Sequence, residues 1–270
     1  MADPKRHGCT NLRGFFQTVT ERLPKKGQQC WYRGQADNKF KLLPSLYRLK
    51  KGTFEEHLTT EFSMKEHFER RKGMIGTPTM SSRIEEMFFL QHYGIKTRLL
   101  DWSENPLIAL FFALQDHTKL LKLGATPASA TVWVLNPYTW NKKSLAHISH
   151  PGFPLSYTNI NVSLLCPPEQ PPPAKLSQMH SDPLAVLGIA NNPRIIAQSG
   201  TFVLFGKTIA SLEVIFDDGT YPVGTLLAID IPTMHVSAML DNLQQIGFTE
   251  SIAYPDIEGV AMEINREAGL

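Results

Sequence analysis

The segment 106–114 (PLIALFFAL) is the feature that most restricts how this chain can fold, because it is apolar on every side of a helix. A helix without a polar face has to be buried on all sides, so the rest of the chain must cover it. Pro106 suits the first helical position, and Ser103 or Asn105 can cap the helix. The chain has 270 residues, of which 42% are hydrophobic, and this is enough for one large core or two modest ones.

The spacing of apolar residues predicts helices in the first half of the chain and strands in the second. Helices are predicted over 11–23, 53–73 and 83–94, and a capping box formed by Ser82 and Glu85 marks the start of the third. This distribution predicts the α+β class, with a mixed or antiparallel sheet. The predicted strands lie at 30–36, 130–137, 184–189, 200–206, 211–216 and 225–232, and residues 95–105 are predicted to link two helices.

The sequence predicts a single domain over residues 1–270, with its core at about 28–262. Residues 151–183 stand apart because they contain many prolines, including the run CPPEQPPPAK, and show no apolar periodicity. Such a composition is typical of a surface excursion that contributes little to the core.

Charge and cysteine content argue against several classes of function. The net charge is +2, which provides no long-range field to attract nucleic acid or an anionic membrane. Cys9, Cys30 and Cys166 are too scattered for a disulfide framework or a zinc site, and they suit a reducing compartment. No stretch has the length of a membrane span, and the first residues lack the apolar core of a signal peptide. We therefore expect a cytoplasmic protein with no membrane segment and no metal site.

Reactive side chains are densest in the segment 88–102, where polar residues interrupt an apolar run. Gln91, His92 and Tyr93 end the predicted helix, and a helix C-terminus stabilises the protonated form of a histidine. Arg98 and Asp101 flank two leucines further on. These two residues either form an ion pair with each other or belong to a binding site, and the pattern leaves both interpretations open.

The segment Trp31–Gln35 raises the same two interpretations. Arg33 either pairs with a buried carboxylate, for which Asp101 is a candidate, or binds a phosphate or carboxylate through its two-pronged guanidinium. Gly34 either permits a bend or lets a ligand approach the backbone, and Gln35 offers both a donor and an acceptor.

Two later segments contain similar residue types. Arg194 and Gln198 precede Gly200 and an aromatic strand, so Arg, Gln and Gly again occur where a strand begins. Asp256 and Glu258, near the end of the chain, suit the N-terminus of a helix.

The sequence contains no GxxxxGK[ST], GxGxxG, GxSxG or HExxH motif, so it carries none of these signatures of known chemistry.

Taken together, the segments WYRGQ, FFLQHYGIKTRLLDWSENPLIALFFA and RIIAQSGTFVLF resemble the FRG domain family, which is named for an [F/Y]RG motif. The resemblance extends over residues 31 to about 260, and members of the family are mostly bacterial and phage proteins. Lys96 departs from the family pattern, in which a proline is common. The matching positions are Tyr32, Arg33, Gly34, Gln91, His92, Tyr93, Gly94, Thr97, Arg98, Leu99, Leu100, Asp101 and Trp102.

The order of the motifs is similar to that of ADP-ribosyltransferases, which have an early Arg or His, a middle aromatic or Ser/Thr segment and a late catalytic Glu. By this analogy Arg33 would hold the pyrophosphate of NAD, Tyr93 would stack on its nicotinamide, and Glu258, with His92, would act in catalysis. The resemblance thus suggests a cleft that binds a small anionic or nucleotide ligand, with NAD as the candidate cofactor. The alternative is a non-catalytic sensing module in which Arg33, Arg98 and Asp101 hold the fold together.

Overall fold

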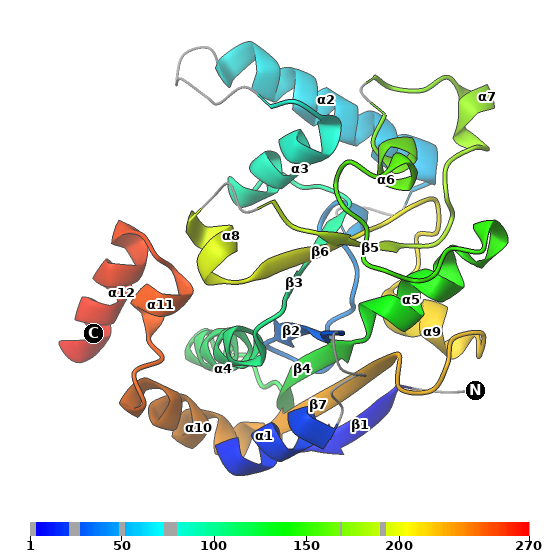
Figure 1. Ribbon diagram of the computed structural model, residues 1–270. Helices are drawn as coiled ribbons and strands as arrows, with labels where there is room; N and C mark the ends of the chain where they lie inside the picture. The colour runs from blue at the N-terminus through cyan, green and yellow to red at the C-terminus, as the bar shows by residue number, and fades with distance from the viewer. Residues whose placement is uncertain are drawn as a thin grey trace.

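The computed structural model describes residues 4–21, 28–48, 52–72, 80–167, 169–189 and 193–269. Within these ranges seven strands form one sheet in the order β1-β7-β4-β2-β3-β6-β5 (Figure 1). The pair β1 and β7 is parallel, and the other neighbours are antiparallel. The strands are β1 (Lys5–Gly8), β2 (Trp31–Gln35), β3 (Leu99–Ser103), β4 (Ser129–Leu135), β5 (Leu184–Leu187), β6 (Gly200–Leu204) and β7 (Leu226–Pro232).

Helices cover both faces of this mixed sheet, and the predicted α+β single-domain fold is confirmed (Figure 1). The longer helices are α1 (Leu12–Glu21), α2 (Phe54–Lys72), α3 (Arg83–His92), α4 (Pro106–Lys122), α10 (Thr233–Gln245) and α12 (Ile257–Glu267). The shorter ones are α5 (Pro137–Ser144), α6 (Ile160–Leu165), α7 (Pro173–Leu176), α8 (Pro193–Ala197), α9 (Leu212–Asp217) and α11 (Glu250–Ala253), with 3-10 turns at Leu46–Arg48 and Ala146–Ile148.

Two clusters of buried apolar side chains lie on the two faces of the sheet. Side chains alternate across a strand, so Trp31 and Trp133 belong to one cluster while Tyr32 and Val134 belong to the other. The first cluster packs under α2 and α3, and the second packs under α1, α4 and α10. The all-apolar helix α4 lies in the second cluster, with most of its side chains buried, as its composition requires.

Local capping signals place the starts of α3 and α4 correctly. Of the two predicted caps for α4, Ser103 and Asn105, Asn105 is the one used, and its side chain accepts a hydrogen bond from the Leu107 amide at 2.9 Å. The Ser82 hydroxyl accepts from the Glu85 amide at 3.4 Å at the start of α3. The Glu85 carboxylate accepts from the Ser81 amide at 2.7 Å, one residue before the position that a standard capping box would use. The predicted helix ends at 22–23 and 73 lie outside the described residues.

Two predictions of local structure were wrong. Residues 211–216 form helix α9, not a strand, because the buried residues Leu212, Ile215 and Phe216 follow helical spacing. Residues 95–105 contain β3, an interior strand of the sheet, where only a linking segment was expected. Short apolar runs fit either a strand or a buried helix turn, and tertiary contacts decide between them.

The prediction that residues 151–183 contribute little to the core was also wrong. Leu155, Val162, Leu165 and Leu176 from this segment are buried in the first cluster. The Leu155 amide also donates to the Ala185 carbonyl at 2.9 Å, which attaches the segment beside β5. The prolines rule out long regular structure here, but they do not prevent the intervening apolar side chains from packing.

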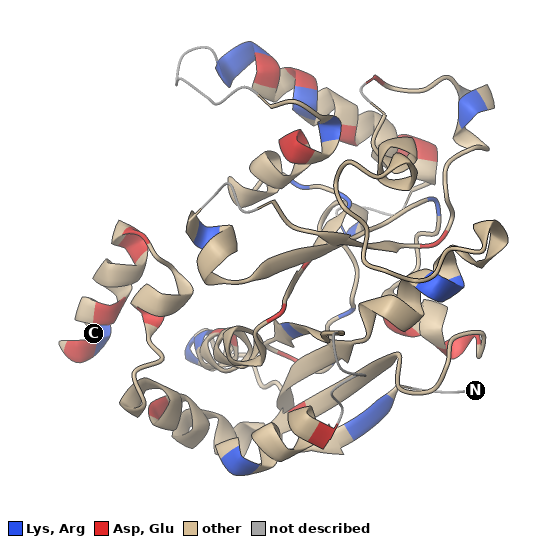
Figure 2. Ribbon diagram, in the orientation of Figure 1, with Lys and Arg blue, Asp and Glu red and all other residues tan. Residues whose placement is uncertain are grey.

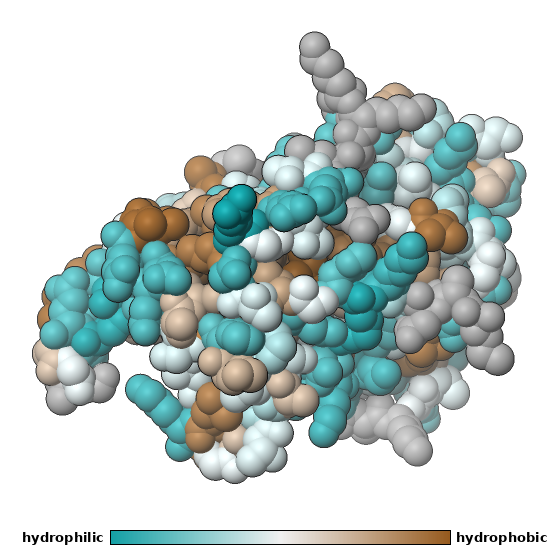
Figure 3. Space-filling model, turned by 90° about the horizontal axis from the view of Figure 1, so that it is seen from below, coloured by the Kyte–Doolittle hydropathy of each residue, from teal (hydrophilic) through white to brown (hydrophobic). Residues whose placement is uncertain are grey.

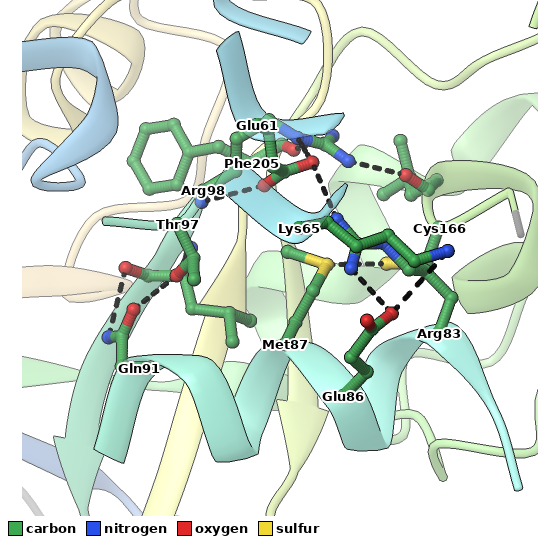
Figure 4. A network of polar contacts seen from close by, with 12 residues as sticks. Glu61, Lys65, Arg83, Glu86, Met87, Gln91, Thr97, Arg98, Cys166 and Phe205 are labelled. Atoms are coloured by element: carbon green, nitrogen blue, oxygen red, sulfur yellow. Dashed lines mark hydrogen bonds and ion pairs between the residues drawn. The ribbon is translucent and has the colours of Figure 1, made fainter. Parts of the chain in front are cut away.

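Arg98 lies at the centre of a buried polar network that joins several elements (Figure 4). Its Nε donates to the Glu61 carboxylate of α2 at 3.1 Å, and its two terminal nitrogens donate to the carbonyls of Phe205 and Leu165 at 3.0 and 2.7 Å. Burial alone would lower the pKa of Arg98, but the neighbouring Glu61 carboxylate raises it above its ordinary value. The predicted alternative of an Arg98–Asp101 ion pair is therefore wrong.

Charged side chains of both signs are distributed over the outer helices and loops (Figure 2). The face seen from below mixes hydrophilic residues with separate apolar patches (Figure 3). Among the helices that the structure describes, none combines the length and the apolar character needed to cross a bilayer.

The packing of α4 on β2 depends on Gly34. A Cβ atom at this position would lie 2.1 Å from the Ala109 carbonyl oxygen and 2.7 Å from the Ala113 amide nitrogen. Both contacts are with backbone, which cannot rotate away. We expect Gly34→Ala to lower the free energy of unfolding by at least about 2 kcal/mol. The measurement is urea unfolding followed by circular dichroism.

Gly8→Ala is the matched control, because Gly8 also lies in a strand and a Cβ there meets nothing within 4 Å. We expect this variant to differ from wild type by less than about 0.5 kcal/mol. Equal stability of Gly34→Ala and Gly8→Ala would show that α4 can move away from β2 without cost.

Candidate functional site

The sheet is split between β2 and β3. These antiparallel strands share a single register pair, Tyr32 opposite Ser103. By contrast, β2 pairs with β4, and β3 with β6, along their full lengths. The next residues of the two strands, Arg33 and Trp102, therefore lie where the ladder opens.

The Arg33 side chain bridges this opening. Its Nη1 donates to the Asp101 backbone carbonyl at 2.5 Å and lies 3.7 Å from the Asp101 carboxylate. The candidate partner Asp101 is thus confirmed, although its own side chain is 57% exposed. The Arg33 Nε is buried and has no hydrogen-bond partner in the described part of the chain. Burial lowers the pKa of Arg33, and the Asp101 carboxylate opposes this effect.

A cavity of about 230 Å³ lies next to the split. Side chains from α3, β3, α4, α8 and β6 form its walls, together with Tyr254, which follows α11. A smaller cavity of about 70 Å³ adjoins it, lies against β2 and α4, and shares four of its lining residues. Three of the shared residues are Asp101, Trp102 and Gln198, and the fourth is Phe112.

Two residues in the wall of the larger cavity each have a buried polar atom without a partner among the described residues. The Trp102 Nε1 and the Thr201 hydroxyl have no hydrogen-bond partner among the described residues, and each side chain belongs to a residue that is 3% exposed. Trp102 and Thr201 are register partners on β3 and β6. Because a buried donor without a partner costs free energy, the pair marks a position where a ligand could complete the hydrogen bonding.

The charged groups at the larger cavity are already balanced. The Arg194 Nη2 donates to Asp256 at 2.7 Å and to Glu258 at 3.3 Å, and the guanidinium lies 5.2 Å from the centre of the Tyr254 ring. Arg194 lines the cavity, whereas Glu258 lies outside the lining, and its side chain is 74% exposed. Asp256 and Glu258 thus lie at the rim, next to a wall residue.

His92 is half-buried at the end of α3 and lines the larger cavity. Burial lowers its pKa, the positive charge of Arg194 lowers it further, and the negative charge of Asp256 opposes both. The expected stabilisation of the protonated form by the helix end is therefore outweighed. The neutral imidazole, which can both donate and accept a hydrogen bond, is favoured.

The family model of the FRG domain matches residues 28–121 of the chain. Residues 28–121 are an FRG domain. No curated protein and no solved structure matches the chain. The FRG domain supplies β2, α3, β3 and α4 to the site, while α8, β6 and Tyr254 come from the part of the chain beyond the match.

Seven of the residues singled out in the sequence converge at the two cavities. The larger cavity is lined by residues of both the FRG domain and the C-terminal part, and the smaller one is lined by residues of β2. The converging residues are Arg33, Gly34, Gln91, His92, Asp101, Arg194 and Gln198. Gln91 is further fixed by a 2.9 Å hydrogen bond from its Nε2 to Asp101, and by a hydrogen bond from the Thr97 hydroxyl.

Three other candidates from the FRG motifs lie outside the cavity linings. Arg98 is 1% exposed and fully engaged in the network of Figure 4. Gln35 accepts from the Trp133 indole at 2.8 Å and donates to the Lys41 carbonyl at 3.3 Å. Tyr93 is 64% exposed and contacts the rings of Phe89 and His92. Arg98 and Gln35 thus make structural contacts within the fold, whereas Tyr93 lies at the surface outside both cavities.

The sequence interpretation missed Trp102, Phe112, Thr201 and Tyr254 as lining residues. Trp102 was noted as part of the FRG motif, but its indole nitrogen could be recognised as unpartnered only in the fold. Tyr254 lies two residues before Asp256 in the segment YPDIEG. Only the two carboxylates of this segment were considered as candidates, although its tyrosine lines the cavity.

The charge of Arg194 makes a testable contribution to the titration of His92. Replacing Arg194 by Gln removes a repulsive positive charge and leaves Asp256 in place. We therefore expect the pKa of His92 to rise in Arg194→Gln. The measurement is a histidine side-chain NMR titration, with the His92 signal assigned by its loss in His92→Gln.

Arg13→Gln is the control, because it removes the same charge from an exposed position on α1. It should leave the pKa of His92 unchanged. A His92 titration that is identical in wild type and Arg194→Gln would show that the two side chains do not interact across the cavity.

Proposed function

We propose that the two cavities at the sheet split bind a nucleotide, with its base ring in the larger cavity. The observation that carries this proposal is a pair of buried polar groups, the Trp102 indole N–H and the Thr201 hydroxyl, which belong to residues of one cavity wall and have no partner in the described chain. A heteroaromatic ring with polar substituents can hydrogen-bond to both groups. The aromatic side chains of Trp102, Phe112 and Tyr254 supply apolar surface for such a ring.

The balance of charged side chains at the cavity favours a ligand whose ring carries a positive charge. Arg33 and Arg194 already face the carboxylates of Asp101, Asp256 and Glu258, so the wall carries no excess of positive charge. Aromatic faces attract cations. The nicotinamide ring of NAD⁺ is aromatic and positively charged, and NAD⁺ is therefore the nucleotide that this site suits best.

The smaller cavity suits the anionic part of the same ligand. The Arg33 Nε is buried there without a partner among the residues described, and it can donate to a phosphate oxygen while Nη1 keeps its bond to the Asp101 carbonyl. In this arrangement Arg33 contacts the ligand and also links β2 to β3 through its bond to the Asp101 carbonyl.

The rim carboxylates favour a second candidate function, transfer of ADP-ribose from NAD⁺. In that reaction the bond between the nicotinamide nitrogen and ribose C1′ breaks, and the electron pair leaves with neutral nicotinamide. The acceptor nucleophile then bonds to C1′ and loses its proton. Asp256 and Glu258 lie within 3.3 Å of a wall residue, where a carboxylate can stabilise the positive charge that develops on the ribose. His92 is the candidate base for the acceptor proton, because its neutral form is favoured.

The proposal is tested by comparing NAD⁺ with NADH, which has a neutral nicotinamide ring. In isothermal titration calorimetry we expect NAD⁺ to bind about tenfold more tightly than NADH. Thr201→Val, which removes only the hydroxyl, should weaken NAD⁺ binding by about tenfold. Nicotinamide released during the titration would identify the transfer or hydrolysis activity, and its absence would favour the binding module.

Thr225→Val is the matched control for Thr201→Val. The Thr225 hydroxyl is equally buried and unpartnered within the described chain, but Thr225 lies outside both cavities. It should bind NAD⁺ as wild type does. Equal affinity for NAD⁺ and NADH would contradict the charged-ring argument, and failure of the folded protein to bind either one would contradict the proposal.

A further inference from the structure

A second polar cavity, of about 400 Å³, lies away from the proposed nucleotide site. Its walls come from the end of α5 and the turn after it, from residues 177–182 that follow α7, and from Lys207 after β6. In Figure 1, α5 and α7 lie to the right of the sheet, whereas α8 and α12 lie to the left. The proposed function makes no use of this cavity.

Backbone contacts hold two of its walls together. The amides of Lys207 and Thr208 donate to the carbonyls of His180 and Ser181 at 3.1 and 3.0 Å. Gly206 makes this approach possible, since a Cβ there would lie 2.2 Å from the His180 carbonyl oxygen. The Lys207 ammonium also donates to the Ser177 carbonyl at 3.2 Å. The cavity is therefore formed before any ligand binds.

The hydrogen bonding of His180 assigns its tautomer. The Asn161 side-chain nitrogen donates to Asn159 at 3.0 Å, so the Asn161 oxygen is the atom that faces the His180 Nε2 at 3.1 Å. The Nε2 must therefore carry the proton and donate it. The His180 Nδ1 remains as the basic nitrogen, and it becomes a second donor when the ring is protonated.

Groups that carry or can gain positive charge converge on this cavity. The His147 and His180 rings lie with their centres 5.2 Å apart, and Lys207 lines the same wall. Burial lowers the pKa of His180, and the positive charges of His147 and Lys207 lower it further. An anion placed among these groups would offset their mutual repulsion.

One carboxylate, that of Asp182, also lines the cavity and contributes a negative charge to it. Burial raises the pKa of Asp182, the negative charge of Asp218 raises it further, and Lys143 and His147 oppose these effects. The Asp182 carboxylate can offset the charge of the Lys207 ammonium. A proton taken up by His180 then adds a positive charge that has no further counter-ion within the cavity lining.

We propose that this cavity binds a small divalent oxyanion of the phosphate or sulfate type, held between the His147 and His180 imidazoles and the Lys207 ammonium. Charge-assisted hydrogen bonds from the imidazoles and the ammonium to its oxygens provide the affinity. Binding strengthens as the His180 imidazole takes up a proton. The site acts independently of the nucleotide cavity.

Sulfate is the best probe, because its charge stays constant across the range in which histidine titrates. We expect sulfate to raise the pKa of His180 in a histidine NMR titration, and to bind about tenfold more tightly at about pH 5.5 than at about pH 7.5. His180→Gln and Lys207→Gln should each weaken binding at the lower pH by about tenfold. His235→Gln, on α10 and outside the cavity, should bind sulfate as wild type does.

Inorganic phosphate and methyl phosphate then distinguish the two sources of such an anion. Tighter binding of methyl phosphate would identify a phosphate monoester as the ligand, and tighter binding of phosphate would identify the free ion. The proposal is overturned if sulfate leaves the His180 titration unchanged or binds equally at both pH values. It is also overturned if Zn²⁺ binds in a His180-dependent manner while sulfate does not.

Discussion

The hydrogen bond from Arg33 to the Asp101 carbonyl is the interaction on which the candidate site depends. The ladder between β2 and β3 consists of one register pair, so the backbone pairing of the two strands is limited to Tyr32 and Ser103, and Arg33 adds a side-chain link beside it. A guanidinium replaces backbone hydrogen bonds just where the strands diverge. Because the strands diverge, the adjoining space is lined by side chains of both halves of the sheet.

Three arginines illustrate three different uses of the same side chain. Arg98 is wholly buried, and its donors are engaged by Glu61 and two carbonyls, so it joins α2, α6 and the end of β6. Arg194 forms ion pairs with the rim carboxylates. Arg33 bridges the split and still has a buried Nε without a partner in the described chain. Arg33, which is only half-buried, and not Arg98 is therefore suited to contact a ligand.

Features set by neighbouring residues could be predicted from the sequence, and those set by distant residues could not. The Asn105 and Ser82 caps and the burial of α4 depend on residues within a few positions of each other. The partner of Arg98 is Glu61, 37 residues away, and the partners of Arg194 are more than 60 residues away. No local pattern encodes such pairs. For this reason the sequence left the role of Arg98 open, and only the fold brings Arg194 and His92 to the same cavity.

Hydrogen–deuterium exchange followed by mass spectrometry tests the role of Arg33 most directly. Arg33→Met keeps an unbranched side chain of similar length and removes every donor. If Arg33 closes the split, exchange should rise in β3 and at the start of α4, while β4 and β7, which pair along their whole length, stay protected. Arg13→Met on α1 should exchange as wild type does. Unchanged protection of β3 in Arg33→Met, or an equal rise across the whole sheet, would contradict this account.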